Sequence, residues 1–366
     1  MFQDKATKLK NYQDGLPLTD NNTVTKVKLP LKQVAQKVFR VEVKKQINTT
    51  FFDCCSGIGS AHLAFKNLNC KCVGYSEIDK KAEETYKLFF GNSIKNYGDL
   101  INIDTNKLVN FDVLLAGFPC QSFSIVGKRK GLEDDRSQVI YGLANIIQNK
   151  KPKAFLLENV KGLVSIQNGI VLEKIVLLLK NCGYKVFYKV LNSIDYGIPQ
   201  ARERIYFIGI RNDLYKKEFK FPTFLNKKPC LKDFLIDNNE KFILTGSLYQ
   251  TFLKYLENKY NKGKYNINDL IAQNYLVMDT RQSDLRLYDN KIPTLRTGRQ
   301  GILYIKNFQI RKISALEALL LQGFDLVMAQ NAQNNFTQTR LLSQAGNAMT
   351  VNVMQVIGKH LLDYLS

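Results

Sequence analysis

Residues 51–60 are Phe-Phe-Asp-Cys-Cys-Ser-Gly-Ile-Gly-Ser, an apolar run that passes through a Gly-x-Gly turn into helical spacing. Glycine at such a turn lets the backbone approach a ligand closely, and the N-terminus of the following helix offers free N–H groups to a carboxylate or phosphate. A strand-to-helix turn also carries glycine for purely geometric reasons. The segment therefore predicts a strand and a helix, and it leaves the ligand open.

From this segment to about residue 211, short apolar runs alternate with amphipathic stretches. This rhythm is typical of βαβ units, in which a parallel sheet carries helices on both faces. We expect strands at 51–54, 71–76, 111–116, 154–157, 185–192 and 205–210. We expect helices at 61–67, 80–90, 137–149, 170–181, 314–321 and 351–365. The fold class is α/β, with a smaller, irregular domain where the pattern becomes rich in Lys, Asn and Tyr.

Composition narrows the class of protein. The chain has 366 residues, of which 45% are apolar and 23% charged, and this excludes a wholly disordered or collagen-like protein. Its formal net charge is +21, which favours a polyanionic partner, because binding of phosphates by Lys and Arg releases counterions. No apolar run approaches the ~18 residues that span a bilayer. The seven cysteines lack the paired Cys-x-x-Cys spacing of a zinc site. We expect a soluble, cytoplasmic protein without a membrane contact or a metal.

Two acidic positions extend the candidate ligand site. Glu77-Ile78 follows the second predicted strand, about 20 residues after the glycines, where a carboxylate grips a ribose hydroxyl in nucleoside-binding sheets. Asp99-Leu100 falls where the next strand is expected to end. Together with the glycine turn, these positions predict an adenosine site at the carboxyl edge of the sheet.

A cysteine is presented at the same edge. Pro119-Cys120-Gln121 follows the strand expected at 111–116, and four cations lie just downstream between Lys128 and Arg136. Positive charge and loop N–H groups stabilise a thiolate, so Cys120 is a candidate nucleophile. The segment 127–136 is too polar for a core and predicts a loop able to cover a phosphodiester.

A carboxylate and two arginines complete the set. Glu158 lies at a strand end, where burial raises the pKa of a carboxyl group and lets it donate or share a proton. Arg202 and Arg204 are two residues apart, so an extended chain points both guanidinium groups to the same side.

These motifs together resemble the cytosine-C5 DNA methyltransferase family of bacterial restriction-modification systems. The matching pieces occur in the family's order and span residue 51 to the C-terminus: Asp53–Gly59, Glu77, Asp99, Pro119-Cys120-Gln121, Glu158-Asn159-Val160, Gln200-x-Arg202-x-Arg204, Arg311–Glu317 and Gln344-x-Gly346-Asn347-Ala348. The resemblance implies a Rossmann-like methyltransferase lobe, a target-recognition lobe, and a cleft between them for double-stranded DNA.

The resemblance also assigns roles. Cys120, Glu158, Arg202 and Arg204 would be catalytic: the thiolate adds to cytosine C6, Glu158 binds N3, and Arg204, supported by Arg202, holds O2 of a base flipped out of the helix. S-adenosyl-L-methionine would be the cofactor, bound by Asp53, Cys55, Gly57, Ile58, Gly59, Glu77, Ile78, Asp99, Leu100, Pro119, Asn347 and Ala348. Cys55 departs from the family pattern, which usually has Phe there, so either an aromatic contact is missing or the change is a harmless small substitution.

DNA contacts are expected on two segments. The expected contact residues are Gln121, Ser124, Lys128 and Arg136 beside the nucleophile, and Arg281, Thr294, Leu295 and Arg296 in the recognition lobe. Arg reads guanine O6 and N7 in the major groove, yet any one of these arginines equally suits a phosphate. The sequence therefore does not identify the target site.

The predicted organisation has four parts. These are a basic extension at 1–47, a catalytic cofactor-binding domain at 48–211, a target-recognition domain at 212–300 and a returning segment at 301–366. The extension carries net charge +6 and is either a DNA-contacting arm or a solvated leader. We expect a monomer, with a cognate restriction endonuclease as a functional partner.

Two other functions stay open. A tRNA cytosine-5 methyltransferase would share nearly every catalytic motif, but that branch usually carries Cys-Phe-Thr, and no cysteine here is followed by Phe-Thr. A non-catalytic DNA-binding relative would have lost Cys120 or Glu158, and both residues are present.

Overall fold

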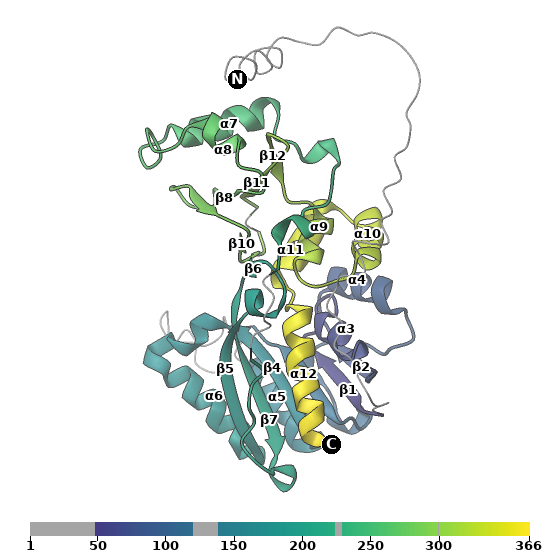
Figure 1. Cartoon of the computed structure of the whole chain (residues 1–366). Helices are drawn as coiled ribbons and strands as arrows, with labels where there is room; N and C mark the ends of the chain where they lie inside the picture. The colour runs from purple at the N-terminus through teal and green to yellow at the C-terminus, as the bar shows by residue number, and fades with distance from the viewer. Residues whose placement is uncertain (1–47, 120–137, 224–228, 299) are drawn as a thin grey trace. The chain divides into compact units, whose positions relative to one another are not determined.

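The computed structural model describes residues 48–119, 138–223, 229–298 and 300–366 (Figure 1). A six-stranded sheet of order β2-β1-β3-β4-β7-β5 forms its centre. Its strands are β1 (Thr50–Cys54), β2 (Lys71–Ser76), β3 (Val113–Gly117), β4 (Ala154–Val160), β5 (Tyr184–Asn192) and β7 (Glu203–Arg211). These strands confirm the α/β prediction and the order of the expected runs.

Helices cover both faces of this sheet, as expected. One face carries α5 (Gln138–Lys150) and α6 (Ile170–Asn181), whose buried residues form one cluster with Phe52, Leu114 and Phe155. The other face carries α3 (Ser60–Lys66), where Phe51 packs on Phe65. The helix α12 (Val351–Leu365) packs against α3 on this face. Phe51 and Phe52 of β1 pack on different faces of the sheet, because successive side chains of a strand point to opposite faces.

The direction of one strand differs from the expectation. β1 to β4 are parallel, but β7 is antiparallel to both neighbours, β4 and β5. β7 follows β5 without a crossover helix, through residues 193–202, and antiparallel strands need no long connection. The sheet is therefore mixed rather than parallel, and β7 begins at the edge where β4 ends.

Local signals fix the helix ends near the candidate site. The helix α4 (Lys80–Phe90) is capped by Asp79, whose side chain accepts from the Lys81 amide, and it ends at Gly91 with φ of 81°. The helix α9 (Ala315–Leu320) begins with a capping box between Ser314 and Glu317. Both caps satisfy backbone N–H groups that a helix N-terminus leaves without partners.

The described part of 212–300, the predicted target-recognition domain, forms with residues 301–312 a region that is more regular than expected. We call it the recognition region. A four-stranded antiparallel sheet of order β12-β11-β8-β9 contains β8 (Val277–Asp279), β9 (Arg286–Tyr288), β11 (Ile302–Lys306) and β12 (Gln309–Lys312). The helices α7 (Gly246–Leu256) and α8 (Ile267–Ile271) pack on it around Phe252, Leu270 and Met278. β11 and β12 lie beyond residue 300, so this sheet draws on two of the predicted regions.

The remaining elements link the two sheets. β6 (Gln200–Ala201) pairs in parallel with β10 (Ile292–Pro293), which joins the entry of β7 to the recognition region. The helices α10 (Leu326–Asn335) and α11 (Gln338–Asn347) were missed by the sequence reading, because their Gln- and Asn-rich composition hides the apolar spacing. No described helix is long and apolar enough to cross a membrane.

Candidate active site

The turn after β1 has the close-packed backbone that its glycines predicted. Gly57 and Gly59 have φ of +56° and +86°, a region that side chains rarely adopt, and a Cβ on Gly59 would lie 2.2 Å from the Phe90 ring. Cys55 also has positive φ, at 49°, although it is not glycine. Ile58 is buried beneath the turn. Residue 59 therefore has to be glycine, while residue 55 holds a strained backbone with a small side chain.

Glu77 closes this turn from the neighbouring strand. Its Oε2 accepts the Gly57 amide at 2.7 Å, and its Oε1 accepts the Asp79 amide at 2.8 Å. Burial raises the pKa of Glu77 against these hydrogen bonds. The next residue, Ile78, is 71% exposed. The structure thus brings Glu77 to the glycine turn, as expected.

Asp99 lies elsewhere than expected. It follows no strand of the sheet; it caps the 3₁₀ helix Leu100–Asn102, where its carboxylate accepts from the Ile101 amide and the Asn102 side chain. The chain before it makes only a single bridge, between Tyr75 and Asn96. Asp99 still lies near the turn, since its negative charge contributes to the raised pKa of Cys55 after burial and the charges of Glu77 and Asp53. Leu100 is buried.

Three buried polar side chains around the turn have no hydrogen-bond partner within the described residues. They are Asp53, of which both carboxylate oxygens are unpaired, Ser56 and Ser60. Burial raises the pKa of Asp53 well above its usual range. Buried polar groups are nearly always paired in folded proteins. This cluster therefore marks a place suited to a ligand that makes hydrogen bonds, and sequence reasoning missed both serines.

Glu158 and Arg204 meet at the edge where β4 ends. The Arg204 Nε lies 3.2 Å from the Glu158 Oε1, and the two side chains are 14% and 9% exposed. Strand register brings them together, because Val160 pairs with Arg204 and Glu158 with Tyr206. Burial raises the pKa of Glu158, and the charges of Arg204 and Arg202 oppose that rise without cancelling it. The contact lacks hydrogen-bond geometry at Oε1, so this carboxyl is buried but only loosely paired.

Arg202 has different partners from Arg204. Its guanidinium is buried and donates to the carbonyl oxygens of Leu295, Gly346 and Ala348, at 3.2, 3.3 and 2.7 Å. Residue 202 lies in the break between β6 and β7, yet the charges of both arginines act on the Glu158 carboxyl.

The described stretch that precedes Cys120 passes beside Glu158 and ends at Pro119. β3 ends at Gly117, which pairs with Glu158, and the buried Asn159 side chain donates to the Phe118 carbonyl at 3.0 Å. Pro119 is exposed at the end of this described stretch. Cys120 and the expected DNA contacts Gln121, Ser124, Lys128 and Arg136 lie outside the described residues. Asn159 fixes the exit of the strand, a role that the sequence reading did not assign.

The expected recognition residues divide into buried and exposed. Arg281 binds both oxygens of Asp279 at 2.7 Å and donates to the Thr294 carbonyl, so its donors serve the fold. Thr294 donates to the Ala201 carbonyl at 2.6 Å, and the Leu295 amide donates to Gln200. Of the four expected residues, Arg296 alone is exposed. The structure therefore gives Arg281 a structural contact in place of an open surface.

The returning segment meets the recognition region backbone to backbone. A Cβ on Gly346 would lie 2.4 Å from the Thr297 amide nitrogen, so only glycine permits this approach. Asn347 is exposed at the end of α11, and Ala348 is buried. Gln344 holds the same segment to α4 through Thr85 and the Lys81 carbonyl.

Comparison with known proteins identifies the family. A family model described as C-5 cytosine-specific DNA methylase matches residues 49–363. The type II methyltransferase M.HhaI of Haemophilus parahaemolyticus is 32% identical over 339 residues, which cover 87% of this chain and 96% of the relative. M.BsuFI of Bacillus subtilis is 34% identical over 322 residues, covering 85% and 72%.

The chain belongs to the C-5 cytosine-specific DNA methylase family. As a member of this family it is a DNA (cytosine-5-)-methyltransferase. Solved structures agree on the fold: S. pombe Dnmt2 methyltransferase matches with a TM-score of 0.65 at 20% identity, over 86% of this chain and 99% of that one. A putative DNA modification methyltransferase from an E. coli prophage matches with a TM-score of 0.64 at 21% identity, over 87% and 99%.

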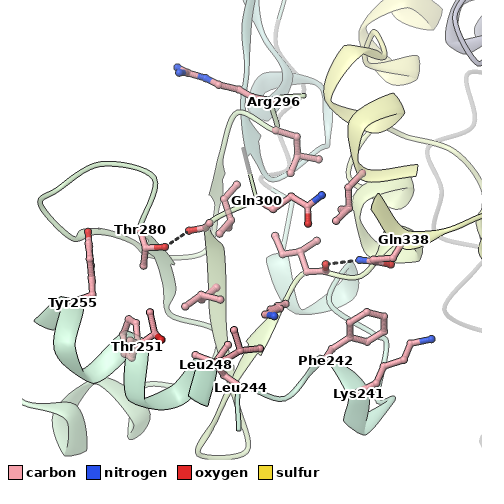
Figure 2. A pocket seen from close by; sticks show the side chains of 18 residues that line it. Lys241, Phe242, Leu244, Leu248, Thr251, Tyr255, Thr280, Arg296, Gln300 and Gln338 are labelled. Carbon is pink, nitrogen blue, oxygen red and sulfur yellow. Dashed lines mark hydrogen bonds between the residues drawn. The ribbon is translucent and has the colours of Figure 1, made fainter. Parts of the chain in front are cut away.

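A cavity of this DNA methylase lies away from Glu158. It has a volume of about 800 Å³ and lies between α7, β11 and the start of α11. Figure 2 shows the side chains that line it. Phe242, Leu244 and Leu248 give it an apolar lining, and none of its lining residues in the described part of the chain is acidic. A smaller cavity of about 180 Å³ includes Arg286 and Arg296 beside Ala201. The small cavity is the one connected to β6 and hence to the entry of β7.

Proposed function

We propose that this DNA methyltransferase transfers a methyl group from S-adenosyl-L-methionine to C5 of one cytosine within a short, specific sequence of double-stranded DNA. The observation that carries the proposal is the buried Glu158 carboxyl, with its raised pKa, beside Arg204 at the edge where β3 and β4 end. A raised pKa lets a carboxyl group hold its proton to a higher pH, which suits hydrogen bonding or proton transfer to a ring nitrogen.

The residues of the site suit covalent catalysis. Cytosine C5 is a poor nucleophile, so the Cys120 thiolate adds to C6 while Glu158 protonates or hydrogen-bonds N3, and the C5–C6 electron pair becomes available at C5. Once C5 carries the methyl group and S-adenosyl-L-homocysteine has left, loss of the C5 proton and cleavage of the C6–S bond restore the aromatic ring and free Cys120. Arg204 holds the cytosine O2 and takes up the charge that develops there.

The target base has to leave the helix. Neither C5 nor C6 can be reached while the cytosine is stacked, so the enzyme flips it into the site, as enzymes that act on bases do. Gln121 and the segment 127–136 would close behind the flipped base. This part of the proposal rests on the sequence motif.

The turn after β1 fits the methyl donor. S-adenosyl-L-methionine supplies an electrophilic methyl group on a sulfonium ion when bound. Glu77 would accept the ribose hydroxyls, and the buried Asp53 carboxyl, which has no partner among the described side chains, would hydrogen-bond the ligand. Gly57, Ile58 and Gly59 would allow close backbone approach, with Cys55, Ile78, Asp99, Leu100, Pro119, Asn347 and Ala348 around them.

Two exposed arginines are the best-supported DNA contacts among the described recognition residues. Arg286 and Arg296 border the same small cavity, and neither is buried. A guanidinium in that position suits a phosphate or a guanine edge. The relatives are named type II methyltransferases. From this we infer that the enzyme protects DNA against a cognate restriction endonuclease.

The test is transfer of tritiated methyl from S-adenosyl-L-methionine to mixed-sequence duplex DNA and to bulk tRNA, followed by bisulfite sequencing. The wild type is compared with Cys120→Ala and with Cys230→Ala, a cysteine outside every motif. We expect methylated cytosines in one short duplex context, lost in Cys120→Ala and kept in Cys230→Ala. Label in tRNA alone, or DNA binding without transfer, contradicts the proposal.

A further inference from the structure

One buried guanidinium contacts two separate parts of the candidate site. Arg202 is 3% exposed, and its Nη1 donates to the Leu295 carbonyl in the recognition region. Its Nη2 donates to the Gly346 and Ala348 carbonyls at the end of α11, beside Asn347. Arg202 therefore joins a candidate DNA-binding segment to a candidate cofactor-binding segment.

Neighbouring contacts hold the same junction. The Gln200 amide group donates to the Leu321 carbonyl at 2.8 Å, and its oxygen accepts the Leu295 amide at 3.0 Å. Thr294 donates to the Ala201 carbonyl, and β10 pairs with β6. Gly346 also lies against the backbone of residues 296–297, so the recognition segment and the end of α11 pack directly on each other.

The geometry of arginine makes this junction sensitive to displacement. A guanidinium is a rigid, planar fork, so its donors satisfy several carbonyl oxygens only when all of them are in place. A carbonyl that moves away leaves a buried donor unpaired, which is unfavourable. Movement of either segment therefore raises the free energy of the contacts made by the other.

We propose that Arg202 is a positioning residue that couples methyl-donor binding to DNA recognition, by holding residues 294–296 and residues 346–348 in one arrangement. The inference rests on the proposed function for the identity of the two ligands. Ordering of one segment by its ligand places the other segment in its binding geometry. Such coupling is reciprocal, so each ligand strengthens the binding of the other by the same factor.

The first experiment measures this factor. S-adenosyl-L-homocysteine is the donor-site probe, and a fluorescent duplex carrying the site found by bisulfite sequencing is the DNA probe. In the wild type we expect saturating S-adenosyl-L-homocysteine to tighten duplex binding about tenfold, and in Arg202→Met we expect that factor to fall to about two or less. The matched control is Arg211→Met, at the far end of β7, where the arginine donates to the Lys151 carbonyl and pairs with Asp213.

A general loss of stability lowers the folded fraction but leaves the coupling factor of the folded molecules unchanged, so the factor separates positioning from mere support. Coupling that is absent from the wild type, or that survives in Arg202→Met, overturns the proposal. Wild-type enzyme that transfers no methyl group counts against the proposed function instead, so the two failures are distinguishable.

Removal of a buried arginine can prevent folding, and two further measurements keep the proposal testable in that case. Arg202→Lys keeps a charge and donors without the fork, and we expect its coupling factor to be at least about threefold smaller than that of the wild type. In the wild type without DNA, we expect S-adenosyl-L-homocysteine to slow hydrogen exchange of the amides in residues 292–297, which lie outside its own site. Unchanged exchange in that segment contradicts the coupling.

Discussion

The central sheet and the recognition sheet each contain a buried pair of a carboxylate and an arginine, and the two pairs are built in opposite ways. Glu158 meets Arg204 through one atom pair at 3.2 Å, across neighbouring strands. Asp279 meets Arg281 through two hydrogen bonds of 2.7 Å, two residues along the chain. Side chains in both pairs are less than 15% exposed, so burial alone does not distinguish them.

The direction of the pKa shift does distinguish the two carboxyl groups. Burial raises the pKa of Glu158 because one off-centre contact does not offset desolvation. Burial acts in the same direction on Asp279, but the hydrogen bonds from Arg281 outweigh it, and the pKa of Asp279 is lowered. A raised pKa lets a buried carboxyl hold a proton to a higher pH and so suits proton transfer, whereas a lowered pKa favours the anion that anchors an arginine.

Glu158→Gln gives the largest expected effect. The amide keeps the shape of the side chain but cannot donate a proton to a base, so we expect the rate of methyl transfer to fall by about 10²–10⁴. The measurement is single-turnover transfer to the identified duplex. Glu203→Gln is the control, since Glu203 makes only a surface ion pair with Lys161. Equal losses of transfer rate in the two variants would show that the Glu158 carboxyl has no special role in methyl transfer.

Asp279→Ala tests the other pair and should act on stability. It leaves the Arg281 charge buried without its partner, and we expect the free energy of unfolding to fall by about 3 kcal/mol. Urea titration followed by circular dichroism measures this loss. The control is Asp284→Ala, which removes an exposed pair with Arg286 at 3.3 Å and should cost at most about 1 kcal/mol. If Asp279→Ala loses no more free energy of unfolding than Asp284→Ala, the Asp279–Arg281 pair has no structural role.

The buried carboxyl of Glu317 tests, through the pH dependence of stability, whether burial without an arginine partner raises a pKa. Glu317 accepts hydrogen bonds from Tyr304 and from the Ser314 and Asp237 amides, without an arginine in that set, and burial raises its pKa from 4.5 to about 7. A raised pKa means that the folded state binds the proton more tightly. Its contribution to stability is therefore complete below pH 4.5 and is lost as pH rises to about 7.

We expect Glu317→Gln to reduce the decrease in stability over this interval by about 1 kcal/mol per pH unit. Urea titrations at half-unit steps of pH measure it. Identical pH profiles for the variant and the wild type would show that the Glu317 carboxyl does not carry the proton.

The smallest expected effect concerns Arg296, which is exposed, unlike Arg281. Arg296→Ala should weaken duplex binding and reduce the slope of log K against log salt by about 1, the change expected when one phosphate contact is lost. Fluorescence anisotropy at several salt concentrations measures the slope. Lys174→Ala, an exposed cation on α6, is the control of equal charge. An unchanged slope in Arg296→Ala places this residue away from DNA.

Much of the central sheet was predictable because its signals are local. The predicted bounds 71–76, 80–90, 170–181 and 351–365 match β2, α4, α6 and α12. The direction of β7 was not predictable, because an apolar run has the same pattern in either direction. The recognition sheet was also missed: its strands have three to five residues and are held by partners distant in sequence, such as Ile302 opposite Asp279.

The candidate site shows the same division. Glu158 and Arg204 were predicted from motif positions, and strand register brings them together. Arg281 was misread because a cluster of arginines favours nucleic acid, although Asp279-Thr280-Arg281 places an acid where it can hold the guanidinium. The missed role of Asn159 required the position of the Phe118 carbonyl, which depends on the pairing of β3 with β4.

The reversed direction of β7 has a consequence for the order of folding. β5 and β7 are joined by ten residues and can pair early, since closing a short loop costs little entropy. β4 precedes β7 by more than forty residues and is separated from it by α6 and β5. Glu158 and Arg204 therefore meet only when this two-stranded unit docks on β4. Recovery of methyl transfer during refolding then reports a late assembly step that the appearance of secondary structure does not.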